Sequence, residues 1–88
     1  MIDVFKILER VKNETGLHCR ALVSIEDDCM LIRFVLFPYD LNYQISIHKR
    51  FLTESPDGYI DSIIDNAIKE INAKIEESKE DYKPFNTL

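Results

Sequence analysis

The chain contains no tryptophan, and its 88 residues include only two glycines, three prolines and two cysteines. So little glycine and proline predicts short loops between regular elements. No apolar run approaches the roughly 20 residues that a membrane-spanning helix needs. The N-terminus also lacks the basic and apolar regions of a signal peptide. Two cysteines without an export signal indicate reduced thiols, so we expect a cytoplasmic protein with no membrane association.

Motifs for catalysis, metal binding or nucleotide binding are missing as well. Cys29 and His48 are expected at diagonal positions on neighbouring strands, about 7–8 Å apart. A nucleophilic pair needs hydrogen-bond contact and a third, orienting group, and none is evident. The acids next to Cys29 show no zinc-ligand spacing, and Cys19 is expected in the core. We therefore expect a protein that is not an enzyme and binds neither metal nor cofactor.

The composition is that of a folded protein. Hydrophobic residues make up 45% and charged residues 31% of the chain, which is typical of a globular domain. We expect one domain over residues 1–82 and a frayed tail over 83–88. The net charge of −5 is unevenly placed, because residues 1–53 are neutral and residues 54–88 carry the whole surplus. A protein that binds phosphate groups needs the opposite sign.

Three segments have the periodicity of strands. Residues 29–37 are apolar on both alternating faces, which is typical of a central strand. Residues 17–25 and 42–48 alternate and predict its two neighbours. A two-residue loop at 27–28 and a four-residue loop at 38–41 place apolar side chains on one common face. The expected pairs are Ile25–Met30, Val23–Ile32, Ala21–Phe34 and Cys19–Leu36 in the first hairpin, and Leu36–Tyr43, Phe34–Ile45 and Ile32–Ile47 in the second.

Two segments have the periodicity of amphipathic helices. Residues 2–15 carry apolar side chains at helical spacing, with Asp3 near the start and Gly16 directly after the end. Residues 56–79 form the clearest amphipathic pattern, and Ser55 is the expected N-cap. The second helix would be roughly 36 Å long, longer than the strands, so we expect its C-terminal turns to overhang the sheet, to fray or to meet a partner. Its expected core residues are Ile60, Ile63, Ile64, Ala67, Ile68, Ile71 and Ile75.

The predicted fold class is α+β: a two-layer domain of helix, three antiparallel strands and helix, with both helices on one face of the sheet. The opposite, outer face would then meet solvent. It would carry an apolar strip flanked by arginines, and such patches mark contact sites. We consider two interpretations, contact with another protein or a second copy, and coverage of the strip by the arginine stems. The candidate protein-binding residues are Arg20, Leu22, Leu31, Arg33, Val35 and Phe37.

A row of acidic residues lies along one face of the second predicted helix. Asp57, Asp61 and Asp65 recur at i,i+4 spacing, which mildly destabilises a helix. One interpretation is that the row mimics nucleic-acid phosphates and occupies a groove on a partner protein. The other is a solvated face, with the earlier acids favoured by the helix dipole.

The order of the predicted elements resembles that of the double-stranded RNA-binding domain over residues 2–79. That family holds phosphates with a lysine cluster at the start of its second helix, where this chain has Pro56-Asp57-Gly58-Tyr59-Ile60-Asp61 and no base. In size, acidity and element order the chain is also similar to small phage-encoded inhibitors, including some anti-CRISPR proteins. We therefore expect an acidic protein-binding module, an adaptor or inhibitor, and no nucleic-acid partner; a nucleic-acid-binding domain is the alternative.

Overall fold

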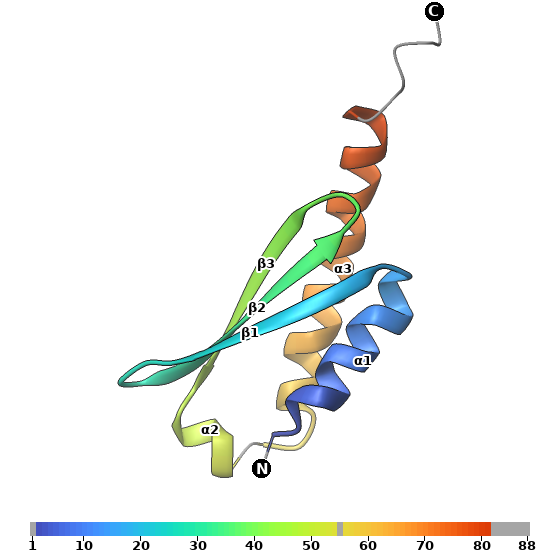
Figure 1. Ribbon diagram of the computed structural model, residues 1–88. Coiled ribbons are helices and arrows are strands. Elements are labelled where there is room, and N and C mark those ends of the chain that lie inside the picture. The colour runs from blue at the N-terminus through green and yellow to red at the C-terminus, as the bar shows by residue number, and fades with distance from the viewer. Residues whose placement is uncertain (1, 55, 82–88) are drawn as a thin grey trace, which may run out of the picture.

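The computed structural model describes residues 2–54 and 56–81, with side chains described as far as residue 78. It confirms the predicted α+β class and the predicted order, and it adds one short helix after the third strand (Figure 1). The expected tail over 83–88 and the expected cap Ser55 lie outside the described residues. The elements are α1 (Val4–Thr15), β1 (His18–Ile25), β2 (Cys29–Phe37), β3 (Leu41–His48), α2 (Arg50–Thr53) and α3 (Tyr59–Asp81).

Helix α1 is bounded by the two residues that its sequence predicts. The side chain of Asp3 accepts a hydrogen bond from the Lys6 N–H at 3.2 Å, which satisfies one free donor of the first turn. Gly16 has a φ of 72° and donates its N–H to the Lys12 carbonyl at 2.9 Å. Glycine adopts this left-handed backbone without steric cost, so the helix ends there and the chain turns into β1.

The sheet has the order β1-β2-β3, and both pairs of strands are antiparallel. The register of the first hairpin is confirmed, since Val23 lies opposite Ile32 and Ala21 opposite Phe34. The predicted register of the second hairpin was wrong by two residues. Phe34 pairs with Tyr43, not with Ile45.

The connection between β2 and β3 explains that error. It contains three residues, Pro38 to Asp40, one fewer than predicted. The Phe37–Pro38 bond is cis, and Asp40 has a φ of 55°. A shift of two residues leaves every side chain on its original face, because the side-chain period of a strand is two. The hydrophobic pattern therefore cannot distinguish the two registers.

Helix α3 begins three residues later than predicted. Gly58 has a φ of 79°, which is not helical, and its carbonyl accepts the N–H of Ser62 at 2.9 Å. Gly58 thus occupies the N-cap position, and Asp57 lies in the turn before the helix. The unpredicted α2 packs against this start, with the ring centroids of Phe51 and Tyr59 4.4 Å apart.

One core lies between the sheet and the helices α1 and α3, which both cover the same face (Figure 1). The central strand contributes three side chains with no exposed surface, Ile32, Phe34 and Leu36. The C-terminal turns of α3 extend beyond the sheet, as its predicted length requires (Figure 1). No helix in the described ranges is long and apolar enough to cross a membrane. Both the sheet and α3 supply buried core residues: Ile32, Phe34, Ile45, Ile64, Ile68 and Ile71.

Candidate functional site

The candidate site is the outer face of the sheet, on the side away from α1 and α3. Antiparallel partners share a face, so the observed register places Leu22 beside Arg33, and Arg20 beside Val35. On the other side of β2, Leu31 lies opposite Ser46. The structure therefore brings together the residues that the sequence assigns to this face. The six candidates are Arg20, Leu22, Leu31, Arg33, Val35 and Phe37.

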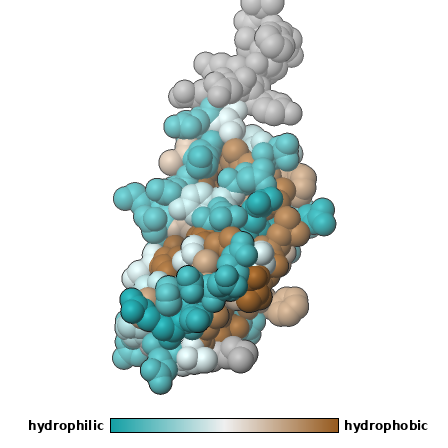
Figure 2. Space-filling view, turned by 90° about the vertical axis from the view of Figure 1, so that its left-hand side faces the viewer, coloured by the Kyte–Doolittle hydropathy of each residue, from teal (hydrophilic) through white to brown (hydrophobic). Residues whose placement is uncertain are grey.

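The apolar side chains of this face are open to solvent, and Arg33 lies among them, between Leu31 and Val35 on β2. Leu22 keeps 48% of its surface exposed, while Leu31, Val35 and Phe37 are half-buried by their neighbours. Figure 2, which views the molecule from the sheet side of Figure 1, shows hydrophobic side chains gathered across the middle of the surface between hydrophilic ones. An apolar strip with a polar border is the arrangement of many protein contact sites.

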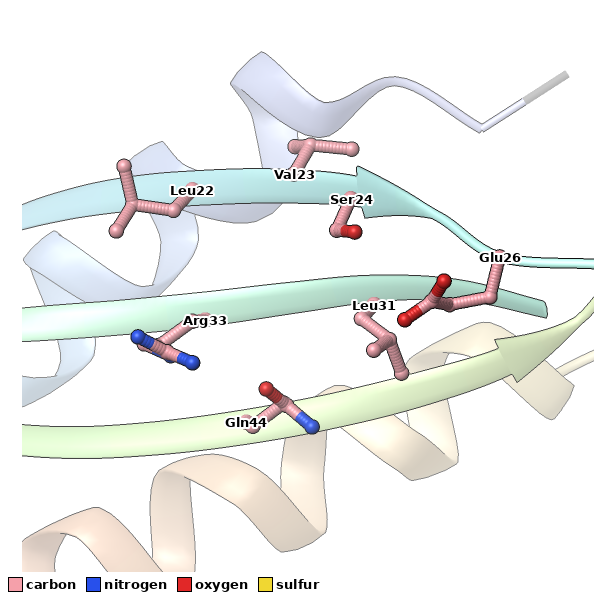
Figure 3. A pocket seen from close by; sticks show the side chains of 7 residues that line it. All are labelled: Leu22, Val23, Ser24, Glu26, Leu31, Arg33 and Gln44. Atoms are coloured by element: carbon pink, nitrogen blue, oxygen red, sulfur yellow. The ribbon is translucent and has the colours of Figure 1, made fainter.

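A shallow hollow lies at the end of the strip near the first hairpin. Its volume is about 270 Å³, and its lining comes from all three strands and the first hairpin loop. Figure 3 shows Leu22 and Leu31 on either side of it, with the Arg33 guanidinium and the Gln44 amide side by side at one border. An apolar side chain could enter here while a carbonyl or carboxylate meets these donors. The lining residues are Leu22, Val23, Ser24, Glu26, Leu31, Arg33 and Gln44.

The two arginines of this face are exposed, and within the described part of the chain neither has an acidic partner. Arg20 and Arg33 therefore present positive charge beside the apolar strip. The third strand of the face, β3, supplies uncharged polar groups such as Gln44 and Ser46. The site thus combines an apolar centre with unpaired cations, a combination that suits a partner with apolar and acidic side chains.

The acidic residues Asp61 and Asp65 lie at the contact between α3 and α1. The Arg10 guanidinium of α1 binds Asp65 directly, and one of its nitrogens lies 3.9 Å from Asp61. The same guanidinium contacts Glu14 at 2.5 Å, and these hydrogen bonds raise the pKa of Arg10. Two of the three predicted acids thus join the helices, while Asp57 lies exposed before α3.

Among the described residues, no hydrogen bond joins a cysteine to a histidine. Cys29 and His48 lie directly opposite each other, not diagonally as predicted, because of the two-residue change in register. The Nδ1 atom of His48 accepts the Arg50 N–H at 3.2 Å. Cys19 is buried, and loss of solvation raises the pKa of its thiol. Among the residues described, no group of three or more His, Cys, Asp or Glu side chains could hold a metal ion.

Sequence reasoning missed a second surface, at the end of β1. Val23 and Ile25 were expected to face the core; they do lie on the helix side of the sheet, but 47% and 71% of their surface is exposed. The 12 residues of α1 span about 18 Å, whereas the eight residues of β1 span about 26 Å. The helix therefore ends before the strand does, and comparing the two lengths in the sequence would have revealed it.

Comparison of the chain with protein-family models, with curated proteins and with solved structures finds no significant match.

Proposed function

We propose that this protein is a small, non-enzymatic, cytoplasmic protein-binding module that acts as an adaptor or inhibitor. The supporting observation is the open apolar strip on the outer face, with the unpaired Arg20 and Arg33 beside its side chains. Neither helix covers this face, although it contains the half-buried leucine, valine and phenylalanine side chains of the central strand. An inhibitor of the kind that phages encode is one form that such a module takes.

The expected partner offers an apolar anchor and acidic side chains. The anchor would enter the hollow beside Leu22 and Leu31, where its burial contributes about 25 cal/mol per Å² of apolar surface. The acids would pair with Arg20 and Arg33. Hot spots of binding are concentrated in such desolvated centres, whereas charged borders mainly influence the association rate and its salt dependence.

The proposal is tested with matched substitutions on the same face. Val35→Glu places a charge in the strip, and Ser46→Glu places the same charge on β3, where the face is polar. Affinity capture from a host lysate, read by mass spectrometry, should retain a specific protein with the wild type and with Ser46→Glu but lose it with Val35→Glu. Unchanged thermal melting would show that the variants fold. Capture that is equal for all three chains would disprove the assignment of this face.

The alternative, a nucleic-acid-binding domain, is tested directly. The field of an acidic chain repels phosphates, and Asp57 and Asp61 stand where the resembling family has bases. We therefore expect no retention of double-stranded RNA or DNA at physiological salt in a filter-binding assay. Retention at physiological salt that weakens as salt rises would favour the alternative over protein binding.

A further inference from the structure

One edge of the sheet, along β1, has backbone groups without partners. The Glu26 N–H donates to the Cys29 carbonyl at 2.8 Å and closes the first hairpin. Hydrogen bonding in an antiparallel pair alternates along the strand, so Leu22 and Ser24 bond to β2 while Val23 and Ile25 direct their N–H and C=O groups outward. In the described ranges, no other element makes backbone hydrogen bonds to this edge.

The side chains along this edge are apolar and exposed. In the described part of the chain, the exposed large hydrophobic residues are Leu22, Val23, Ile25 and Phe5, and the first three lie on β1. Edge strands are normally protected from pairing by lysine, proline or a bulge. Residues 21–25 contain no charge and no proline, and their pairing with β2 is regular. Figure 3 shows Val23 at the free side of β1, away from β2.

Helix α1 carries two apolar side chains, Phe5 and Leu8, beside this edge. Ile7 and Val11 face the core, and Arg10 faces α3. Successive residues of a helix are rotated by about 100° around its axis, so Phe5 and Leu8 lie on the flank of α1 opposite Arg10. This flank faces away from α3, on the side beyond β1. Phe5, 84% exposed, and Leu8 line a hollow of about 420 Å³ together with Glu9, Lys12 and Asn13, all from α1. A fourth strand would therefore find backbone partners on β1 and apolar contacts on α1.

We propose that this fourth strand is β1 of a second copy, so that two chains form one continuous, six-stranded antiparallel sheet. A two-fold axis through the strand pair makes the same edge serve both partners. The outward N–H and C=O groups on β1 belong to its odd-numbered residues. Val23 must therefore pair with an odd-numbered residue of the other copy. The added strand must also contact apolar side chains on both faces of the sheet edge. The β1 strand of a second copy carries apolar side chains on both of its faces.

Charge complementarity favours an axis at Val23 over an axis at Leu22 or at Ala21. With the axis at Val23, Ala21 lies opposite Ile25 of the second copy, and Arg20 lies opposite Glu26 of the second copy. Within the described residues, neither Arg20 nor the Glu26 carboxylate has an ionic partner. An axis at Leu22 would place Arg20 opposite Ser24, and an axis at Ala21 would place it opposite Leu22. Only the first of these three registers forms two opposite-charge pairs across the axis.

The first test blocks the hydrogen bonds of the edge. Val23→Pro removes an N–H that β2 does not use, and Ser46→Pro does the same on β3, whose even-numbered residues face its free edge. Sedimentation equilibrium should show a wild-type dimer, a dissociation constant raised at least tenfold by Val23→Pro, and no change with Ser46→Pro. A wild-type chain that stays monomeric at about 1 mM, where even weak pairing with a dissociation constant near that value would be visible, would overturn the proposal.

The second test addresses the register and does not depend on proline. Arg20→Glu should weaken the dimer about tenfold, because two attractive pairs become repulsive. Adding Glu26→Arg in the same chain should restore wild-type dimerisation, since the pairs form again with reversed signs. Both residues are exposed in the single chain, so the variants should keep its melting temperature. A double variant as weak as the single one would rule out this register, and a dimer unaffected by Arg20→Glu would overturn it equally.

Discussion

The substitution Phe34→Ala measures how far the fold depends on its central strand. Phe34 has no exposed surface, and it lies between Ala21 and Tyr43 on the inner face of the sheet. Both helices cover this face, so the space left by the ring cannot fill with water or close by a local shift. Substitution of a buried phenylalanine by alanine costs about 3–5 kcal/mol. A chain of this length has about 4–13 kcal/mol in total, so the variant would be close to unfolding.

Urea denaturation followed by circular dichroism would measure this loss. With a denaturant dependence of about 1–3 kcal/mol per M, the midpoint should fall by roughly 2 M. The matched control is Phe5→Ala, which removes the same atoms from a side chain that is 84% exposed. Measured at low protein concentration, the control should change the stability by less than about 0.5 kcal/mol. A loss below about 1 kcal/mol for Phe34→Ala would refute the placement of this ring in the core.

Further predictions concern the hydrogen bond of Tyr43, the two thiols and the contact between the helices. The hydrogen bond to Glu70 raises the pKa of Tyr43 to about 12, so its stabilisation is present below pH 10 and is lost as pH rises through 12. Tyr43→Phe should remove this alkaline loss, as pH-dependent melts would show. A thiol reagent should label the half-buried Cys29 rapidly and the buried Cys19 only on unfolding; equal rates by mass spectrometry would contradict the burial. Arg10→Met should cost about 1 kcal/mol in low salt and less in high salt, and a salt-independent cost would argue against an ionic role.

The sequence predicts those parts of the fold that depend on periodicity and caps. Asp3 and Gly16 mark the ends of α1 because capping is a local property of the residues themselves. The register of the first hairpin follows from the apolar face, since a slip of one residue would turn every side chain to the other side. A slip of two residues has no such effect. The register of the second hairpin therefore depends on the length of the loop at 38–40, which the hydrophobic pattern does not report.

The candidate site was predictable only in part. The outer face follows from alternation once the helices are assigned to the other side, so Leu31 and Val35 were placed correctly. The exposed end of β1 was not predicted, because alternation shows which side Ile25 faces but not whether a helix reaches that far. The role of Asp65 depends on a contact with Arg10, which is 55 residues away in the chain, and no local pattern carries such information.

The elongated arrangement of the elements separates two regions of low local stability. The first hairpin extends beyond α1 at one end of the molecule, and the C-terminal turns of α3 extend beyond the sheet at the other (Figure 1). Local opening costs least where few apolar side chains are packed, so both ends can open while the region around Phe34 stays closed. The packed core separates the two ends, so a change at one end leaves the contacts of the other end intact. Each end can therefore be ordered, cleaved or extended by an inserted segment independently of the other.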